Sequence, residues 1–176
     1  KDLEVMISLL KSLGSKITLS KDKKTAKIIN PKKMKTFASY SIVKKMRGSF
    51  LVLGPLVAKQ KNSKCSLPGG CNLGARPVNY HLEGLKKLGM SFRLKDGYIL
   101  AKSKGKLKGT VITFPKISVG ATSNLIIAAC LAQSKTILHG CAIEPEIKDL
   151  TNFLNSAGAK IKWSGRSCII EGVNRL

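Results

Sequence analysis

Three segments of the chain carry apolar residues at three- and four-residue steps, which is the pattern of amphipathic helices. Their sequences are DLEVMISLLKSLG, YHLEGLKKLG and IKDLTNFLNSAG. Each segment closes on a glycine (Gly14, Gly89 or Gly158), a residue suited to the left-handed end of a helix. Each helix pattern then leads into a strand pattern. The last two continue through a turn into a second strand, whereas the first is predicted to have one strand only.

Two further segments, MRGSFLVLGPLVAKQ and GATSNLIIAACLAQS, are almost wholly apolar. We predict that both are helices buried on nearly all sides, because they have few polar positions to face water. Each is followed by a short strand, by a turn containing proline and by one of the amphipathic helices, and a strand such as GTVITF opens the unit. The chain is therefore predicted to repeat one βαβαββ unit.

These repeats predict a single α/β (α+β) domain over residues 1–176, with three related units at roughly 1–30, 31–105 and 106–176. Because the apolar helices need burial, the expected architecture is inside-out, with buried helices surrounded by mixed sheets. A chain of 176 residues can bury about two-thirds of its unfolded surface, so a core of this kind is feasible. The first unit lacks its opening half and the chain begins without methionine, so we expect a fragment with a truncated first unit.

The net charge of +23 raises the question of a nucleic-acid partner. Only five of the 32 basic residues are arginine, although arginine forks are favoured in base and phosphate recognition. Aromatic residues make up only 5% of the chain, and the sequence shows no stripe in which they alternate with basic residues. We therefore expect lysine-rich solvated faces and no nucleic-acid partner, with a basic nucleic-acid-binding domain kept as the alternative. No apolar run reaches the ~20 residues of a membrane span, so no membrane contact is expected.

The cysteines indicate neither a disulfide framework nor a zinc site, because their number is odd and no pair has C-x-x-C spacing. Cys130 and Cys141 lie in apolar runs and are predicted to be small core residues. A reducing cytoplasm fits this cysteine usage best. The five positions are Cys65, Cys71, Cys130, Cys141 and Cys168.

Four motifs, KMRGSFLVLGPLVA, CSLPGGCNLGARPV, FPKISVGAT and EPEIKDL, resemble those of the enolpyruvyl transferases, in the same order and over nearly the whole chain. The Pro-Gly-Gly-Cys block resembles the branch of this family that acts on a UDP-linked amino sugar. The resemblance implies a two-domain bacterial enzyme of inside-out α/β units that binds its substrates between the domains. Here the second domain is absent, so the chain alone is expected to be inactive.

The resemblance also implies an activity. This is transfer of an enolpyruvyl group from phosphoenolpyruvate to the 3-hydroxyl of UDP-N-acetylglucosamine with release of phosphate, the first committed step of peptidoglycan synthesis. It implies neither a metal nor an organic cofactor. The alternative outside this reaction is a nucleic-acid-binding domain or a fold relative that processes RNA ends.

Three residues are expected to do the chemistry, by resemblance. Cys71 would protonate the methylene carbon of phosphoenolpyruvate, a role open to a thiol that is mostly protonated at neutral pH yet able to lose its proton. Arg47 and Arg76 would hold the phosphate-bearing substrate and the intermediate, because a guanidinium fork binds phosphate and carboxylate groups bidentately.

Two further segments are expected to bind the nucleotide sugar. The first, from Arg76 to Tyr80, would bind the uracil base. Asn79 and Tyr80 replace the aspartate and leucine usual in the family. The second would follow the diphosphate at the N-terminus of a buried helix, where free N–H groups favour anions. Its residues are Lys116, Ile117, Ser118, Val119 and Gly120, and those of the first segment are Arg76, Pro77, Val78, Asn79 and Tyr80.

Two other residues keep alternative interpretations. His81 is either a packed or capping residue at a helix start, or a contributor to the site. Glu144 is either an acidic residue at a helix N-terminus, or part of the nucleotide site.

Overall fold

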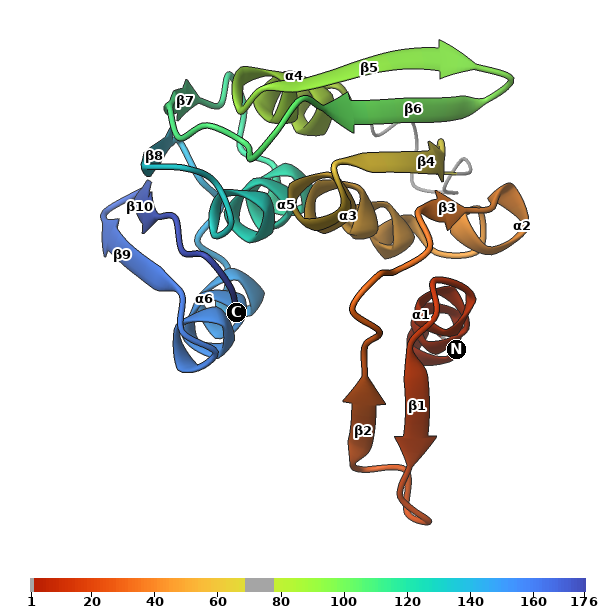
Figure 1. Ribbon diagram of the computed structural model, residues 1–176. Coiled ribbons are helices and arrows are strands. Elements are labelled where there is room, and N and C mark those ends of the chain that lie inside the picture. Colours follow the sequence, from red (N-terminus) through yellow and green to blue (C-terminus); the bar gives the residue numbers. More distant parts are fainter. Residues whose placement is uncertain (1, 69–77) are drawn as a thin grey trace.

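The computed structural model describes residues 2–68 and 78–176 (Figure 1). The elements in chain order are α1 (Asp2–Ser12), β1 (Lys16–Leu19), β2 (Ala26–Ile29), β3 (Phe37–Ala38), α2 (Tyr40–Val43), the 3₁₀ helix η1 (Arg47–Val52), α3 (Leu53–Gln60), β4 (Asn62–Ser66), α4 (Asn79–Lys87), β5 (Met90–Lys95), β6 (Tyr98–Ser103), β7 (Val111–Thr113), α5 (Val119–Ala129), β8 (Lys135–His139), α6 (Pro145–Ser156), β9 (Lys160–Ser164) and β10 (Ser167–Glu171).

Two four-stranded sheets share one topology. Their strand orders are β3-β4-β6-β5 and β7-β8-β10-β9. In each sheet the first two strands are parallel and the other neighbouring pairs are antiparallel. Each sheet and its helices follow the order βαβαββ along the chain. The first part of the chain contributes only α1 and the separate hairpin β1-β2, whose strands are mostly exposed and project away from the rest of the molecule (Figure 1).

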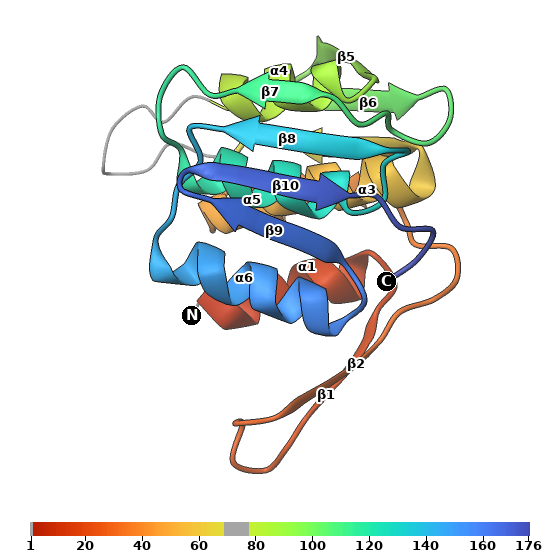
Figure 2. The same cartoon turned by 90° about the vertical axis from the view of Figure 1, so that its left-hand side faces the viewer.

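Helices α3 and α5 lie between the two sheets, seen nearly end-on at the centre of Figure 1. Figure 2 views the sheet β7-β8-β10-β9 face-on, with α5 behind it. Helix α5 contacts α3, α4, α6 and β10, and eight of its eleven residues are buried. The predicted inside-out α/β architecture is confirmed: the apolar helices are inside and the mixed sheets outside. Within the described residues, no helix is long and apolar enough to span a membrane.

The three predicted glycine helix ends are confirmed. Gly14, Gly89 and Gly158 have φ values of +108°, +99° and +102°, a region that side chains rarely adopt. The backbone reverses there and leads each helix directly into its strand.

Two details of the sequence prediction are wrong. The segment from Met46 to Gln60 is not one helix, because it begins as η1 and becomes α-helical only at Leu53. The first unit also has a second strand, since β2 pairs antiparallel with β1 over the whole length of both strands. Its pattern was missed because lysines interrupt the apolar residues of this exposed hairpin.

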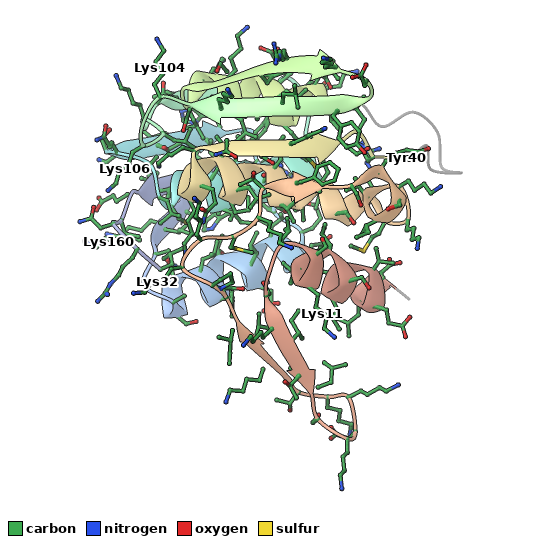
Figure 3. All side chains as sticks on the ribbon, turned by 45° about the vertical axis from the view of Figure 1, so that its right-hand side comes forward. Lys11, Lys32, Tyr40, Lys104, Lys106 and Lys160 are labelled. Atoms are coloured by element: carbon green, nitrogen blue, oxygen red, sulfur yellow. The ribbon has the colours of Figure 1, made fainter. Side chains whose placement is uncertain are left out.

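Lysines project into solvent from many elements. Figure 3 labels Lys32, Lys106 and Lys160, which extend on one side of the molecule, while Tyr40 lies on the opposite side. Lys106 Nζ donates to Asn174 Oδ1 at 2.7 Å. This arrangement agrees with the predicted lysine-rich solvated faces.

Candidate active site

A groove with a volume of about 510 Å³ lies at the N-terminal end of α5. Its walls come from η1, from the start of α4 and from the segment that leads into α5. We call it the α5 groove; its lining residues are Arg47, Gly48, Phe50, Leu51, Val78, Tyr80, His81, Ile117, Ser118, Val119 and Gly120.

Seven residues predicted from the sequence therefore meet in one groove, although they come from three separate parts of the chain. They are Arg47, Val78, Tyr80, Ile117, Ser118, Val119 and Gly120. Arg47, the first residue of η1, is half-buried.

Other predicted residues lie elsewhere. The side chain of Lys116 is exposed and does not line the groove. Asn79 lines an adjoining cavity of about 360 Å³, which it shares with Tyr80. Cys71, Arg76 and Pro77 lie outside the described residues.

The first turn of α5 forms one wall of the groove. Ser118 is the N-cap residue, and its Oγ accepts a hydrogen bond from the Ala121 backbone N–H at 3.3 Å. The remaining N–H groups of a first helical turn have no partner inside the helix and favour anions. Ser118 therefore shapes the helix start through its side chain, in addition to any contact with a ligand.

Behind the groove lies a buried polar network centred on Asn124 of α5, a side chain that is fully buried. Its Oδ1 accepts from the Gly54 backbone N–H at 3.0 Å. Its Nδ2 lies 3.1 Å from His81 Nδ1 and 3.4 Å from the Phe50 carbonyl oxygen. One side chain thus connects η1, α3 and α4 to the central helix.

His81 is a packed residue that also lines the groove. The interpretation as a packed residue is confirmed, and a contribution of His81 to the site stays a prediction. Its ring packs edge-on against Phe50, with centroids 5.2 Å apart. Burial, with a smaller contribution from the positive charge of Arg47, lowers the pKa of His81 to about 4. The imidazole is therefore neutral at pH 7.

The whole chain can be compared with known proteins. The model of the EPSP synthase (3-phosphoshikimate 1-carboxyvinyltransferase) family matches residues 1–176, the whole chain. The chain belongs to the EPSP synthase family. The resemblance to enolpyruvyl transferases inferred from the motifs is thus confirmed.

Curated relatives of the chain are named UDP-N-acetylglucosamine 1-carboxyvinyltransferase. One from Pelagibacter ubique is 58% identical over 177 residues, which is 100% of this chain and 42% of the relative. One from Dinoroseobacter shibae is 47% identical over 176 residues, 99% of this chain and 42% of the relative. The chain thus spans about 42% of the length of these relatives.

Solved structures with the same fold include the enolpyruvyl transferase NikO from Streptomyces tendae, at a TM-score of 0.77 and 16% identity. The match covers 98% of this chain and 40% of the NikO chain. An EPSP synthase from Acinetobacter baumannii matches with a TM-score of 0.76 and 19% identity, over 99% of this chain and 40% of its own. These identities establish the fold alone. The relatives and structures named here give no support to a nucleic-acid function.

The four cysteines that the structure describes are all fully buried. The prediction that Cys130 and Cys141 are core residues is confirmed. Burial raises the pKa of Cys65 to about 12 and the pKa values of Cys130 and Cys141 to about 11. The pKa of Cys168 is also raised by burial. None of these four thiols is poised to react as a thiolate.

Glu144 is the N-cap residue of α6, followed by Pro145 in the first turn. It does not line the α5 groove. Its Oε2 is buried without a hydrogen-bond partner among the described residues. The interpretation as an acidic residue at a helix start therefore fits its position. Within residues 2–68 and 78–176, no cluster of three or more His, Cys, Asp or Glu side chains could hold a metal ion.

Sequence reasoning missed Asn124, the residue that ties the walls of the groove together. A signal for it existed, since Asn124 is a lone amide at the start of the apolar run NLIIAACLA. A buried amide requires hydrogen-bond partners, so this position could have been marked for a network.

Folding brings lysines and aromatic rings together although the sequence has no basic–aromatic stripe. Lys64 Nζ lies 5.1 Å from the ring centroid of Phe37 and 4.8 Å from that of Tyr98. Lys44 lies 5.0 Å from the ring centroid of Tyr40. These contacts pair the lysines with aromatic rings within the chain.

Proposed function

We propose that the protein containing this chain transfers an enolpyruvyl group from phosphoenolpyruvate to the 3-hydroxyl of UDP-N-acetylglucosamine and releases phosphate. The observation that carries the proposal is the 58% identity, over the whole chain, to a protein named for this reaction. The meeting of seven predicted substrate-binding residues in the α5 groove supports it. The reaction would serve peptidoglycan synthesis, and with it cell wall formation, cell shape and division, in the bacterial cytoplasm.

The proposed binding mode places the nucleotide sugar along the first turn of α5. The diphosphate would lie beside Ser118, Val119 and Gly120, where free N–H groups and the helix dipole favour anionic oxygens. The base would lie toward Val78 and Tyr80, on the α4 side of the groove. A further domain of the same protein would complete the site.

The proposed chemistry begins at Cys71. Its thiol would give a proton to the methylene carbon of phosphoenolpyruvate while the sugar 3-hydroxyl oxygen bonds to the adjacent carbon. The proton that this hydroxyl loses would restore the Cys71 thiol. Arg47 and Arg76 would hold the phosphate and carboxylate groups of the tetrahedral intermediate. Cleavage of the carbon–oxygen bond to phosphate, with transfer of a proton from the methyl carbon to the departing phosphate, would then give the enolpyruvyl sugar and inorganic phosphate.

Phosphate release by the full-length protein tests this proposal. We expect release that requires both phosphoenolpyruvate and UDP-N-acetylglucosamine. The Arg47→Ala variant should lose about 10- to 150-fold in kcat/KM, because a hydrogen bond between charged groups contributes about 1.5–3 kcal/mol. Shikimate 3-phosphate is the competing acceptor, since the matching family model is described by that reaction. Release that depends on shikimate 3-phosphate instead of the UDP-sugar would refute the proposed acceptor.

A further inference from the structure

The orientation of the Asn124 side chain follows from its partners. A backbone N–H can only donate, so the atom that faces Gly54 N at 3.0 Å must be the amide oxygen. The amide nitrogen then faces the Phe50 carbonyl oxygen and His81 Nδ1. No other amide orientation satisfies Gly54.

This orientation determines where His81 carries its proton. The Asn124 NH₂ group has donors only, so His81 Nδ1, 3.1 Å away, must accept the hydrogen bond. A ring nitrogen that accepts carries no proton. The neutral imidazole of His81 therefore carries its single proton on Nε2.

The protonated nitrogen lies beside the start of α5. A Cβ atom built on Gly120 would be 3.2 Å from both Cε1 and Nε2 of His81, so this ring edge packs directly against the glycine. Nε2 has no hydrogen-bond partner among the described residues. It is nevertheless not completely shielded from solvent. Because His81 lines the groove, this nitrogen has access to it.

We propose that Asn124 is a positioning residue that holds His81 as its Nε2–H tautomer, so that His81 offers an uncharged hydrogen-bond donor to an anionic oxygen bound in the α5 groove. The identity of that oxygen, a diphosphate oxygen of the UDP-sugar, rests on the function proposed above. A donor fixed in this way keeps the same charge through physiological pH and does not repel Arg47. The positive charge of Arg47 on η1 lowers the pKa of His81. The residues of α5 that face the ring, Asn124 and Gly120, are uncharged.

The tautomer can be tested without any substrate. We expect the ¹⁵N spectrum of His81 in the full-length protein to show a proton-bearing Nε2 and a proton-free Nδ1, unchanged between pH 5 and pH 8. In Asn124→Asp, one carboxylate oxygen still accepts from Gly54 and the other faces Nδ1, so the proton should move to Nδ1 or the ring should become doubly protonated. A wild-type ring protonated on Nδ1, or an unchanged tautomer in Asn124→Asp, would overturn the proposal.

The contact with the ligand is tested by calorimetry, with UDP-N-acetylglucosamine as the probe. His81→Leu removes the Nε2 donor, and we expect binding to weaken about 10- to 100-fold, the usual effect of losing a hydrogen bond to a charged group. His81→Gln places an amide N–H near the position of Nε2 and should bind within about threefold of wild type. Equal binding by His81→Leu and wild type would overturn the ligand contact.

Misfolding and failure of the proposed function are separated by two controls. Circular dichroism of each variant checks that it folds, and His81→Gln serves as the rescue that a purely structural role for the ring would not predict. Absence of enolpyruvyl transfer in wild type, together with intact UDP-sugar binding that depends on His81, refutes the proposed reaction but supports the donor. Absence of UDP-sugar binding in wild type refutes the ligand assignment, while the ¹⁵N spectra still decide the tautomer.

Discussion

Substitution of Gly54 by alanine should destabilise the protein through one close contact between α3 and α5. A Cβ atom at this position would overlap Asn124 Oδ1 and would lie 2.8 Å from the Asn124 carbonyl oxygen. The backbone carbonyl cannot move without shifting α5, which packs against α3, α4 and α6. The two helices must therefore separate, or the Gly54–Asn124 hydrogen bond must break.

The size of the effect follows from two costs. Overpacking of a close-packed interior costs about 1–3 kcal/mol. A buried amide oxygen left without its donor costs about 1–3 kcal/mol more. Since partial relaxation lowers both, we expect a loss of about 3 kcal/mol in the free energy of unfolding. For a chain of this size, this corresponds to a fall of roughly 6–12 °C in Tm.

Thermal unfolding followed by circular dichroism measures this change. The matched control is Gly105→Ala, because a Cβ atom at Gly105 meets no heavy atom within 4 Å and its φ is not positive. The control should stay within about 0.5 kcal/mol of wild type. If Gly54→Ala melts within about 2 °C of wild type, the close approach of α3 and α5 at Asn124 is refuted.

Four other predictions follow from the buried groups and the groove. In the full-length protein, an epoxide phosphonate that mimics phosphoenolpyruvate should alkylate Cys71 alone, because burial raises the pKa of the four described thiols; peptide mapping of the label onto Cys141 would contradict this. Lys116→Ala should weaken UDP-sugar binding by at most about fivefold in calorimetry, because an ion pair of an exposed lysine contributes under about 1 kcal/mol; a 100-fold loss would mean that Lys116 is enclosed by the bound ligand. The folded pKa of His81, about 4, lies below the ordinary value of 6.5, so the unfolded chain binds a proton that the folded chain lacks between these values. The free energy of unfolding should therefore fall by about 3 kcal/mol as pH drops from about 6.5 to about 4, and urea titrations should find this contribution missing in His81→Gln. Leu125→Ala empties a fully buried position of α5 and should cost about 2–5 kcal/mol in the same titrations; a loss below 1 kcal/mol would refute tight packing there.

Local signals were sufficient for the elements that repeat along the chain. The glycines at positions 14, 89 and 158 indicated helix ends because a helix often ends on a residue with positive φ, which glycine adopts without strain. The apolar run NLIIAACLA indicated a buried helix because it offers few polar side chains to water. Eight of the eleven residues of α5 are indeed buried. Strand β2 lacked such a signal, since all of its residues are exposed and burial therefore imposes no pattern of apolar residues on it.

The candidate site was predicted as residue types and was assembled only by packing. Motifs identified Arg47, Tyr80 and Gly120 one by one, but their meeting depends on how η1 and α4 pack against α5. The pairing of Lys64 with Phe37 and Tyr98 likewise needs three strands side by side.

The βαβαββ repeat, the buried character of two helices and the family can be read from the chain, because they follow from local periodicity and short motifs. The role of Asn124 and the protonation of His81 depend on how the helices pack. Nothing along the chain relates Asn124 to Gly54 or to His81, which lie 70 and 43 residues away. The proton on His81 is placed by the directions of hydrogen bonds across three elements, and such directions exist only once the helices have packed.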